Sequence, residues 1–282
     1  AAGILREILD RSIKSLDDLK GITDKPVLGQ ISFDMYSPKR PLIVEVDPRA
    51  PRSESFRALR TNLTFIDAAE QPKTIVITSS VTGEGKSTVT MNLAMTMAQA
   101  GMRLCLIEAD LRRPKVLEYM GLDGSVGLTD ALIGNAPIFD VLQQYGDTSL
   151  WVVGAGSIPP NPSELLGSPA MRTVLAELGE EFDQIIIDAP PVLPVTDAVV
   201  LSTVADGVIV VAGSGLVERD DFKHTLESIE SVTGKVLGIV LNRAPRSEGD
   251  PYSRYSYAYS LPEEEVTRRD RRRAGQSERD GR

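Results

Sequence analysis

One short stretch constrains the fold of this chain more than any other: residues 79–88 read Ser-Ser-Val-Thr-Gly-Glu-Gly-Lys-Ser-Thr. The apolar run 74–78 precedes it, and the helical pattern 89–100 follows it. A strand, a glycine-rich turn ending in Gly-Lys-Ser and a helix together predict a phosphate-binding loop. Ser80 stands where the generic motif begins with glycine, but the flanking strand and helix compensate for that departure. The alternative is a glycine-rich turn with an incidental lysine.

The residue types of this loop follow from the chemistry of phosphate. Gly83 and Gly85 let the backbone curl so that successive N–H groups converge on phosphate oxygens. Lys86 places a positive charge against the β and γ phosphates, and the hydroxyl of Ser87 is a ligand for Mg2+. We therefore expect nucleotide to bind the residues of the loop, namely Thr82, Gly83, Glu84, Gly85, Lys86, Ser87 and Thr88.

Length and composition limit the remaining possibilities. With 282 residues, the chain can hold one α/β domain of about 200 residues plus appendages. The net charge of -9 argues against nonspecific binding to nucleic acid. The single cysteine, Cys105, lies in an apolar run and is interpreted as a small core residue. No apolar run approaches the roughly 20 residues of a membrane span. The chain begins without methionine, so the sequence leaves an upstream membrane segment open.

The first 51 residues are interpreted as a juxtamembrane helix and linker, not as a second domain. Apolar residues at helical spacing predict a short amphipathic helix; they are Leu5, Ile8, Leu9, Ile13 and Leu16. Prolines punctuate the segment 37–51 and predict a connector. We expect the phosphate-loop domain over residues 52–245 and a tail over residues 246–282.

A further helix is predicted from Arg52. Glu54, Arg57 and Arg60 stand three residues apart, so they share one face of that helix. Their carboxylate and guanidinium groups could bind a neighbouring chain. Spacing alone favours a solvated charged face over an interface.

Carboxylates follow two of the predicted buried strands. Strand 103–107 leads into Glu108, Asp110 and Arg112, and strand 182–187 leads into Asp188. Side chains at the carboxyl ends of strands point into the crevice where open α/β sheets bind ligands. Glu108 and Asp110 are two apart, so we expect them to share a side, as a Mg2+ ligand and a base, with Arg112 contacting phosphates. The alternative is that these acidic residues merely end a strand.

The alternation of strands and helices predicts a doubly wound, mostly parallel α/β sheet with helices on both faces. Further strands are predicted near residues 150–153, 207–212 and 235–241, with helices between them. Asn242 and Arg243 end the last strand, on the edge where nucleotide should bind. An asparagine amide has both a donor and an acceptor, which suits the edge of adenine.

The character of the sequence changes beyond residue 245. Few aliphatic residues and a high charge predict disorder there. The tail carries four clustered tyrosines, which are Tyr252, Tyr255, Tyr257 and Tyr259. Core packing does not explain them, so they are either an aggregation-prone segment or a phosphorylation substrate, and the ATP site favours the second.

Together these segments resemble the catalytic domain of the bacterial tyrosine kinases of capsule and exopolysaccharide synthesis. The resemblance spans nearly the whole chain. It rests on Thr78-Ser79-Ser80 before the loop, residues 110–114, residues 159–166, residues 188–191, the tyrosine cluster, and the E-x-x-R-x-x-R pattern of Glu54, Arg57 and Arg60. This chain has Glu108 where the family usually has aspartate, and Thr82 where many members have proline.

The resemblance implies a P-loop NTPase fold and phosphoryl transfer from MgATP to tyrosine. Lys86 would hold the phosphates, Ser87 and Asp110 would approach Mg2+, and Asp188 would act in or near the metal shell. Glu108 or Asp110 would accept or orient the tyrosine proton. The tail tyrosines would be phosphorylated by a neighbouring subunit of a ring, with residues 54–60 at the interface.

The same resemblance implies partners and a location. It implies a chain-length-determinant membrane region, fused upstream or separate, a cognate tyrosine phosphatase, and a position at the cytoplasmic face of the plasma membrane. Two rivals share this fold class or its nucleotide: a MinD or ParA-type partitioning ATPase, and a non-catalytic ATP-binding scaffold. The MinD type has a second lysine five residues before the loop lysine, where this chain has Val81.

Overall fold

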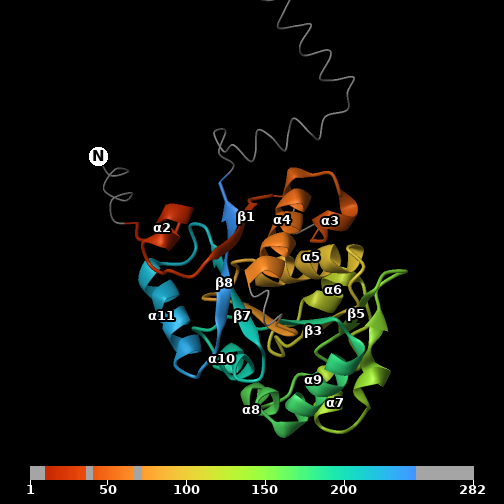
Figure 1. The fold of residues 1–282 in the computed structure, drawn as a ribbon. Helices are drawn as coiled ribbons and strands as arrows, with labels where there is room; N and C mark the ends of the chain where they lie inside the picture. The colour runs from red at the N-terminus through yellow and green to blue at the C-terminus, as the bar shows by residue number, and fades with distance from the viewer. Residues whose placement is uncertain (1–9, 36–40, 67–71, 246–282) are drawn as a thin grey trace, which may run out of the picture.

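The computed structural model describes residues 10–35, 41–66 and 72–245. Eight strands form a single sheet in the order β1-β8-β7-β2-β6-β3-β5-β4 (Figure 1). All neighbouring strands run parallel except the pair of β4 with β5. The strands are β1 (Val27–Ser32), β2 (Thr74–Ser79), β3 (Leu104–Glu108), β4 (Gln143–Gln144), β5 (Leu150–Val153), β6 (Gln184–Asp188), β7 (Gly207–Gly213) and β8 (Val236–Ala244). The predicted mostly parallel sheet is confirmed.

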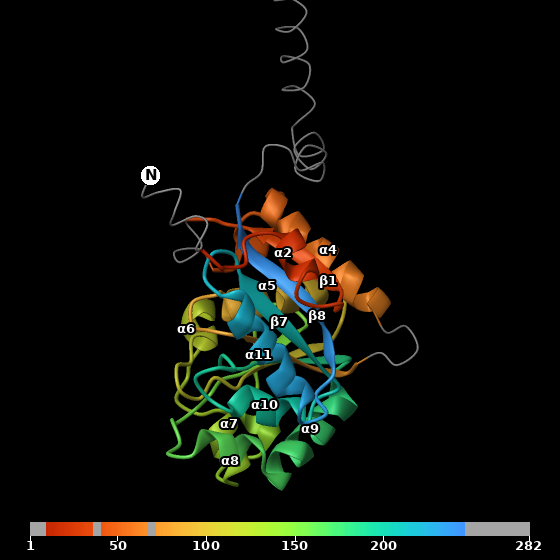
Figure 2. The same ribbon diagram turned by 90° about the vertical axis from the view of Figure 1, so that its left-hand side faces the viewer.

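Helices cover both faces of the sheet (Figures 1 and 2). One face carries α3 (Ile43–Val46), α4 (Pro51–Ile66), α5 (Lys86–Gln99) and α6 (Val116–Met120). The other carries α7 (Leu128–Leu132), the 3-10 helix η1 (Ile138–Val141), α8 (Pro162–Leu166), α9 (Pro169–Glu181), α10 (Asp197–Ser202) and α11 (Arg219–Glu230). The doubly wound arrangement is therefore as predicted.

The central strands separate two apolar cores. Every residue of β2 is buried, and successive side chains of a strand point to opposite faces. Val76 accordingly belongs to the core under α9 and α11, whereas Ile75 and Ile77 belong to the core under α4 and α5. A strand buried on both faces reads as a continuous apolar run, which is why the sequence located it well.

The N-terminal helix prediction is wrong over residues 10–15. Ser12 forms an isolated antiparallel bridge with Glu218, and the N–H of Ile13 donates to the carbonyl of Val217 at 2.9 Å. The helix α2 (Leu16–Lys20) starts later, because Ser15 caps it in a capping box with Asp18. The earlier apolar positions, Leu5, Ile8 and Leu9, lie outside the described residues.

The linker interpretation also fails, since β1 is part of the sheet and pairs in parallel with β8. Leu28 and Ile31 are buried in the core that contains Leu59 of α4. α4 packs directly on this strand, since a Cβ at Gly29 would be in ordinary van der Waals contact with the Leu59 side chain, at 3.5 Å. Three apolar residues interrupted by Gly29 and Gln30 are too weak a signal to distinguish an edge strand from a connector. The tyrosine tail lies outside the described residues.

Candidate active site

The phosphate loop leaves the carboxyl end of β2 and enters α5 at Lys86. Gly83 and Gly85 have φ angles of 93° and 89°, in the left-handed region that favours glycine. A Cβ on Gly85 would lie 2.3 Å from Nδ2 of Asn242, so no side chain fits there without displacing that amide. The predicted local geometry of the loop is therefore present.

Lys86 is the centre of the polar cluster at this edge of the sheet. Its Nζ lies 2.9 Å from Oδ2 of Asp110, 3.3 Å from Oδ2 of Asp188 and 3.2 Å from Oγ of Ser87. Burial acts to lower the pKa of Lys86, but the charges of Asp188 and Asp110 outweigh burial and raise that pKa above its ordinary value. The fold thus brings four predicted site residues together and keeps the lysine charged.

Asp188 ends β6 and is 1% exposed. It accepts hydrogen bonds from Oγ of Ser87 at 2.6 Å and from Oγ1 of Thr90 at 3.1 Å. Burial raises the pKa of Asp188, while Lys86 and the Ser87 hydrogen bond oppose that rise. Sequence reasoning did not single out Thr90. Its signal was its position four residues after Lys86, which places both side chains on one face of α5.

Glu108 makes its hydrogen bonds outside this cluster. Its carboxylate accepts hydrogen bonds from the backbone N–H groups of Lys115, of Val116 at 2.5 Å and of Ala155 at 3.4 Å. Burial is the main cause that raises the pKa of Glu108. The two carboxylates have different partners, because Asp110 contacts Lys86 and accepts from the N–H of Arg113 at 3.1 Å. Their shared role as a Mg2+ ligand and a base stays a prediction. Glu108 thus supports the start of α6, and Asp110 alone of the two contacts Lys86.

Arg112 is also held by a partner that the sequence did not indicate. Its Nε and Nη2 lie 2.8 Å and 3.0 Å from the two carboxylate oxygens of Asp197, in α10. This hydrogen-bonded pair is the main reason that the pKa of Arg112 is raised. The guanidinium therefore bridges the end of β3 and the start of α10.

Two residues at the end of β8 contact the phosphate loop. Nδ2 of Asn242 donates to the carbonyl of Glu84 at 2.8 Å, and Nη1 of Arg243 donates to the carbonyl of Gly83 at 3.3 Å. Arg243 also lies over the ring of Phe33, 5.1 Å from its centroid. Oδ1 of Asn242 is buried and, within the described part of the chain, has no hydrogen-bond partner. That orphaned acceptor fits an amino group of a nucleotide base.

Glu84 accepts hydrogen bonds from the phosphate loop and from the end of β7. The side chain is fully buried, and its two oxygens accept from the N–H of Val81 at 2.8 Å and of Gly213 at 2.7 Å. Burial raises the pKa of Glu84 to about 7. Glu84 therefore ties the loop to the end of β7.

The charged face of α4 is tied to its own chain in this structure. Arg57 pairs with Glu54 at 2.8 Å and donates to the carbonyl of Pro48 at 2.6 Å. Arg60 donates to the carbonyl of Thr96 at 3.3 Å. These contacts are compatible with both an interface and a solvated face.

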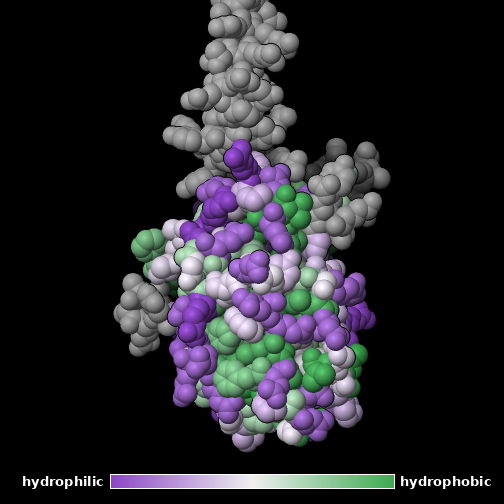
Figure 3. All heavy atoms as spheres, turned by 90° about the vertical axis from the view of Figure 1, so that its right-hand side faces the viewer, coloured by the Kyte–Doolittle hydropathy of each residue, from purple (hydrophilic) through white to green (hydrophobic). Residues whose placement is uncertain are grey.

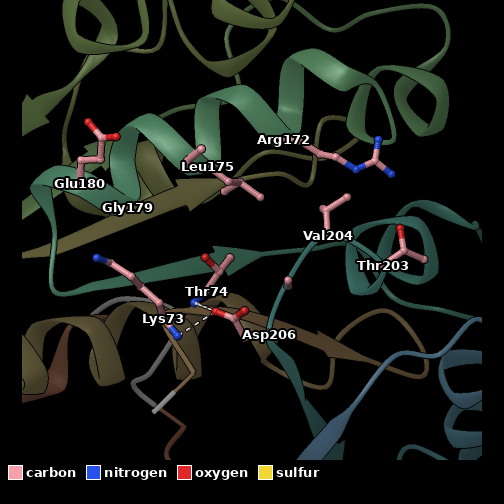
Figure 4. A pocket seen from close by; sticks show the side chains of 11 residues that line it. Lys73, Thr74, Arg172, Leu175, Gly179, Glu180, Thr203, Val204 and Asp206 are labelled. Carbon is pink, nitrogen blue, oxygen red and sulfur yellow. Dashed lines mark hydrogen bonds between the residues drawn. The ribbon is translucent and has the colours of Figure 1, made fainter. Parts of the chain in front are cut away.

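Two hollows lie away from this site. One, of about 720 Å³, lies at the opposite ends of β2 and β7, where Lys73 and Arg172 flank it (Figure 4). The other, of about 540 Å³, is lined by Phe139, Leu142 and Trp151 near the β4–β5 edge. Figure 3 shows apolar side chains gathered on that side of the molecule. Neither hollow includes a residue of the phosphate loop.

Within residues 10–35, 41–66 and 72–245, no helix has the length and apolarity of a membrane span. The same ranges contain no group of three or more His, Cys, Asp or Glu side chains placed to hold a metal ion. A Mg2+ ion held by few protein ligands and by substrate phosphates does not need such a group.

A family profile described as ParA, NUBPL iron-transfer P-loop NTPase, matches residues 70–247, more than half of the chain. The sheet, the loop and this match define the class: the chain is a P-loop NTPase of the ParA type. A solved MinD from Pyrococcus horikoshii in complex with Mg-ADP is 24% identical with a TM-score of 0.52, which shows the shared fold.

More similar proteins specify the family. The tyrosine-protein kinase YwqD of Bacillus subtilis is 38% identical over 217 residues, covering 77% of this chain and 92% of that protein. The tyrosine-protein kinase CpsD of Streptococcus agalactiae is 37% identical over 195 residues, covering 69% and 83%. The chain belongs to the bacterial tyrosine-protein kinases, as its resemblance to the kinases of capsule and exopolysaccharide synthesis predicted.

Solved structures agree with this assignment. The crystal structure of the chimerical protein CapA2B2 has a TM-score of 0.77 and 36% identity, covering 82% of this chain and 100% of that one. The kinase domain of the Escherichia coli tyrosine kinase ETK has a TM-score of 0.76 and 28% identity, covering 83% and 95%. By homology the chain is a tyrosine-protein kinase, and its class implies ATP as the nucleotide.

Proposed function

We propose that the chain transfers the γ-phosphoryl group of MgATP to the tyrosines of its own tail, presented by a neighbouring copy. One observation carries this proposal: Lys86, Ser87, Asp110 and Asp188 meet at the phosphate loop, with Lys86 no more than 3.3 Å from each of the other three. The acceptors would be Tyr252, Tyr255, Tyr257 and Tyr259.

The residues of the site fit MgATP. Lys86 and the backbone N–H groups of the loop, from Thr82 to Thr88, would hold the β and γ phosphates. The orphaned Oδ1 of Asn242 would accept from the adenine amino group, with Arg243 beside it. Ser87 and Asp110 would hold Mg2+, with Asp188 in or near its shell; the ion would neutralise phosphate charge.

Of the two carboxylates Glu108 and Asp110, we assign Asp110 as the group that receives the proton of tyrosine. In this step the phenolic oxygen bonds to the γ-phosphorus, and the bond from that phosphorus to the β–γ bridging oxygen breaks, which leaves ADP. The phenolic proton passes to the Asp110 carboxylate. Glu108 has both oxygens engaged by backbone N–H groups, so we assign it to supporting Asp110 through the segment between β3 and α6. Positioning and charge neutralisation would supply most of the acceleration.

The proposal includes an assembly at the membrane. The face with Glu54, Arg57 and Arg60 would pack against the next subunit of a ring, so that each tail reaches its neighbour's site. The similar solved protein CapA2B2 is described as a chimera. By analogy, we infer that this chain also works together with a second protein region that activates it. We infer a chain-length-determinant membrane region as that activator, a cognate phosphatase, a place at the cytoplasmic face of the membrane, and control of polysaccharide synthesis and export.

Mass spectrometry after incubation with MgATP tests the proposal. Wild-type protein should gain phosphate on tail tyrosines, and Lys86→Met should not. Lys73→Met is the matched control, because Lys73 lies at the opposite ends of the strands and should leave phosphorylation unchanged (Figure 4).

The two rival functions give different results in the same experiment. ATP hydrolysis that responds to DNA or lipid, without phosphotyrosine, would favour a partitioning ATPase. ATP binding without either reaction would favour the regulatory scaffold.

A further inference from the structure

One buried carboxylate near the active site has no place in the phosphate-loop cluster. Asp197 lies in the first turn of α10 and is 0% exposed. Its two oxygens accept the Nε and Nη2 groups of Arg112 at 2.8 Å and 3.0 Å. A buried charge is costly unless it is paired and hydrogen-bonded, so this two-point geometry fixes the plane of the guanidinium.

Ser163 completes the arrangement from a third element. Its hydroxyl donates to Oδ1 of Asp197 and accepts from Oγ1 of Thr196 at 3.2 Å. Ser163 lies in the first turn of α8, within the loop 159–166, to which sequence reasoning gave no chemistry. Both the donor and an acceptor of this hydroxyl are in use, so its orientation is set by its neighbours.

Arg112 is close in the chain to a member of the phosphate-loop cluster. It follows Asp110 by two residues, and Asp110 contacts Lys86 at 2.9 Å. The Arg112 side chain is 41% exposed, so one side of it faces solvent. Among the described residues, Nη1 has no hydrogen-bond partner, whereas Nε and Nη2 are both engaged. The guanidinium therefore keeps N–H groups for an anion while Asp197 holds its other edge.

We propose that Asp197 and Ser163 are positioning residues that hold Arg112 ready for the phosphoryl group in transfer. This inference rests on the proposed function, in which Arg112 contacts phosphate. A free arginine side chain samples many rotamers, but a guanidinium held in advance needs no reorganisation during the reaction. The loop 159–166 would act on catalysis through Asp197 and Arg112, without touching the substrate.

Steady-state kinetics of four variants test the proposal, with phosphotyrosine formation and ATP hydrolysis measured in parallel. We expect Arg112→Ala to lower kcat by about 100-fold, as loss of a transition-state donor does. Asp197→Asn and Ser163→Ala should lower kcat by about 10-fold, with KM for ATP within about twofold of wild type. The control is Asp206→Asn, which removes a carboxylate bonded to the N–H groups of Lys73 and Thr74 at the opposite strand ends. It should lower thermal stability and leave kcat unchanged.

The double variant separates positioning from general stability. Once Arg112 is alanine, Asp197→Asn should lower kcat no further, because its effect passes through the guanidinium. A further fall in kcat in the double variant would overturn the proposal. So would single variants of Asp197 and Ser163 that raise KM for ATP and lower Tm but keep the wild-type kcat. A wild-type kcat in Arg112→Ala would also overturn it. In that case the kinase function itself would still be supported if Lys86→Met forms no phosphotyrosine. If the wild type hydrolyses ATP without making phosphotyrosine, the same kinetic pattern in hydrolysis would still support positioning.

Discussion

Ser87, at the start of α5, donates a 2.6 Å hydrogen bond to Asp188, which ends β6. The two residues are 101 positions apart, and the contact joins the phosphate loop to a neighbouring strand. Asp188 is buried, so its charge is balanced mainly by Lys86, at 3.3 Å, and by hydroxyl donors. The loop lysine, the Ser87 hydroxyl and the strand carboxylate therefore form one electrostatic unit.

Asp188→Asn should remove the negative charge that pairs with Lys86 in this unit. Asparagine keeps the shape of aspartate but removes the charge that Lys86 and a metal shell require. We expect phosphotyrosine formation to fall by at least about 100-fold. Rates measured on variants with native circular dichroism check this expectation. A rate within a few-fold of wild type would exclude Asp188 from the reaction. Thr90→Val is the companion variant, because it removes one hydrogen bond and should have a smaller effect.

Gly85→Ala should disrupt the loop sterically. Its φ of 89° costs a non-glycine residue about 1–2 kcal/mol, and the new Cβ would lie 2.3 Å from Asn242 Nδ2. We expect the amide to be displaced and ATP binding to be lost in calorimetry. Gly101→Ala is the matched control, because Gly101 has a φ of 93° with nothing within 4 Å of its Cβ position. It should lose similar backbone stability and bind ATP normally; equal loss of ATP binding in both variants would refute the steric argument.

Glu84 makes the stability of the fold depend on pH. Its pKa rises from 4.5 to about 7 on folding, so the folded state holds the proton more tightly than the unfolded state. Stability from this group is therefore present at low pH and is lost as pH rises from about 4.5 to 7. We expect the wild type to lose on the order of 2 kcal/mol relative to Glu84→Gln between pH 5 and 8. Denaturant titrations of both proteins at the two pH values measure this difference in the free energy of unfolding. Parallel curves with no change in the difference would contradict the prediction.

Tail phosphorylation should weaken the assembly. Each phosphotyrosine adds nearly two negative charges, and several close together repel one another. We expect light scattering to show a smaller particle after incubation with MgATP than after phosphatase treatment. Glu54→Ala with Arg57→Ala should give the small particle in both states, because it removes the predicted contact. An unchanged size on phosphorylation would rule out this cycle.

Local sequence was sufficient for the central part of this fold. The loop 79–88 and the fully buried strands β2, β3, β6 and β7 were located from sequence, because a phosphate loop is a local motif and a doubly covered strand is a continuous apolar run. Parallel strand order then placed Asp110 and Asp188 at the same edge as Lys86.

What the sequence could not decide depends on contacts between distant residues. β1 joins the sheet because it pairs with β8 and packs under α4. Its own apolar pattern is too short to predict a strand. Glu108 accepts from backbone N–H groups at the start of α6, whereas Asp110 contacts Lys86, and residue spacing does not reveal this difference in partners. Asp197 and Arg112 form a hydrogen-bonded pair although they are 85 positions apart, and no periodicity in the sequence predicts such a contact. Local patterns were therefore enough for the fold class, the loop and the family. Which polar groups face one another follows only from the packed fold, because packing sets the distances between residues that are far apart in the chain.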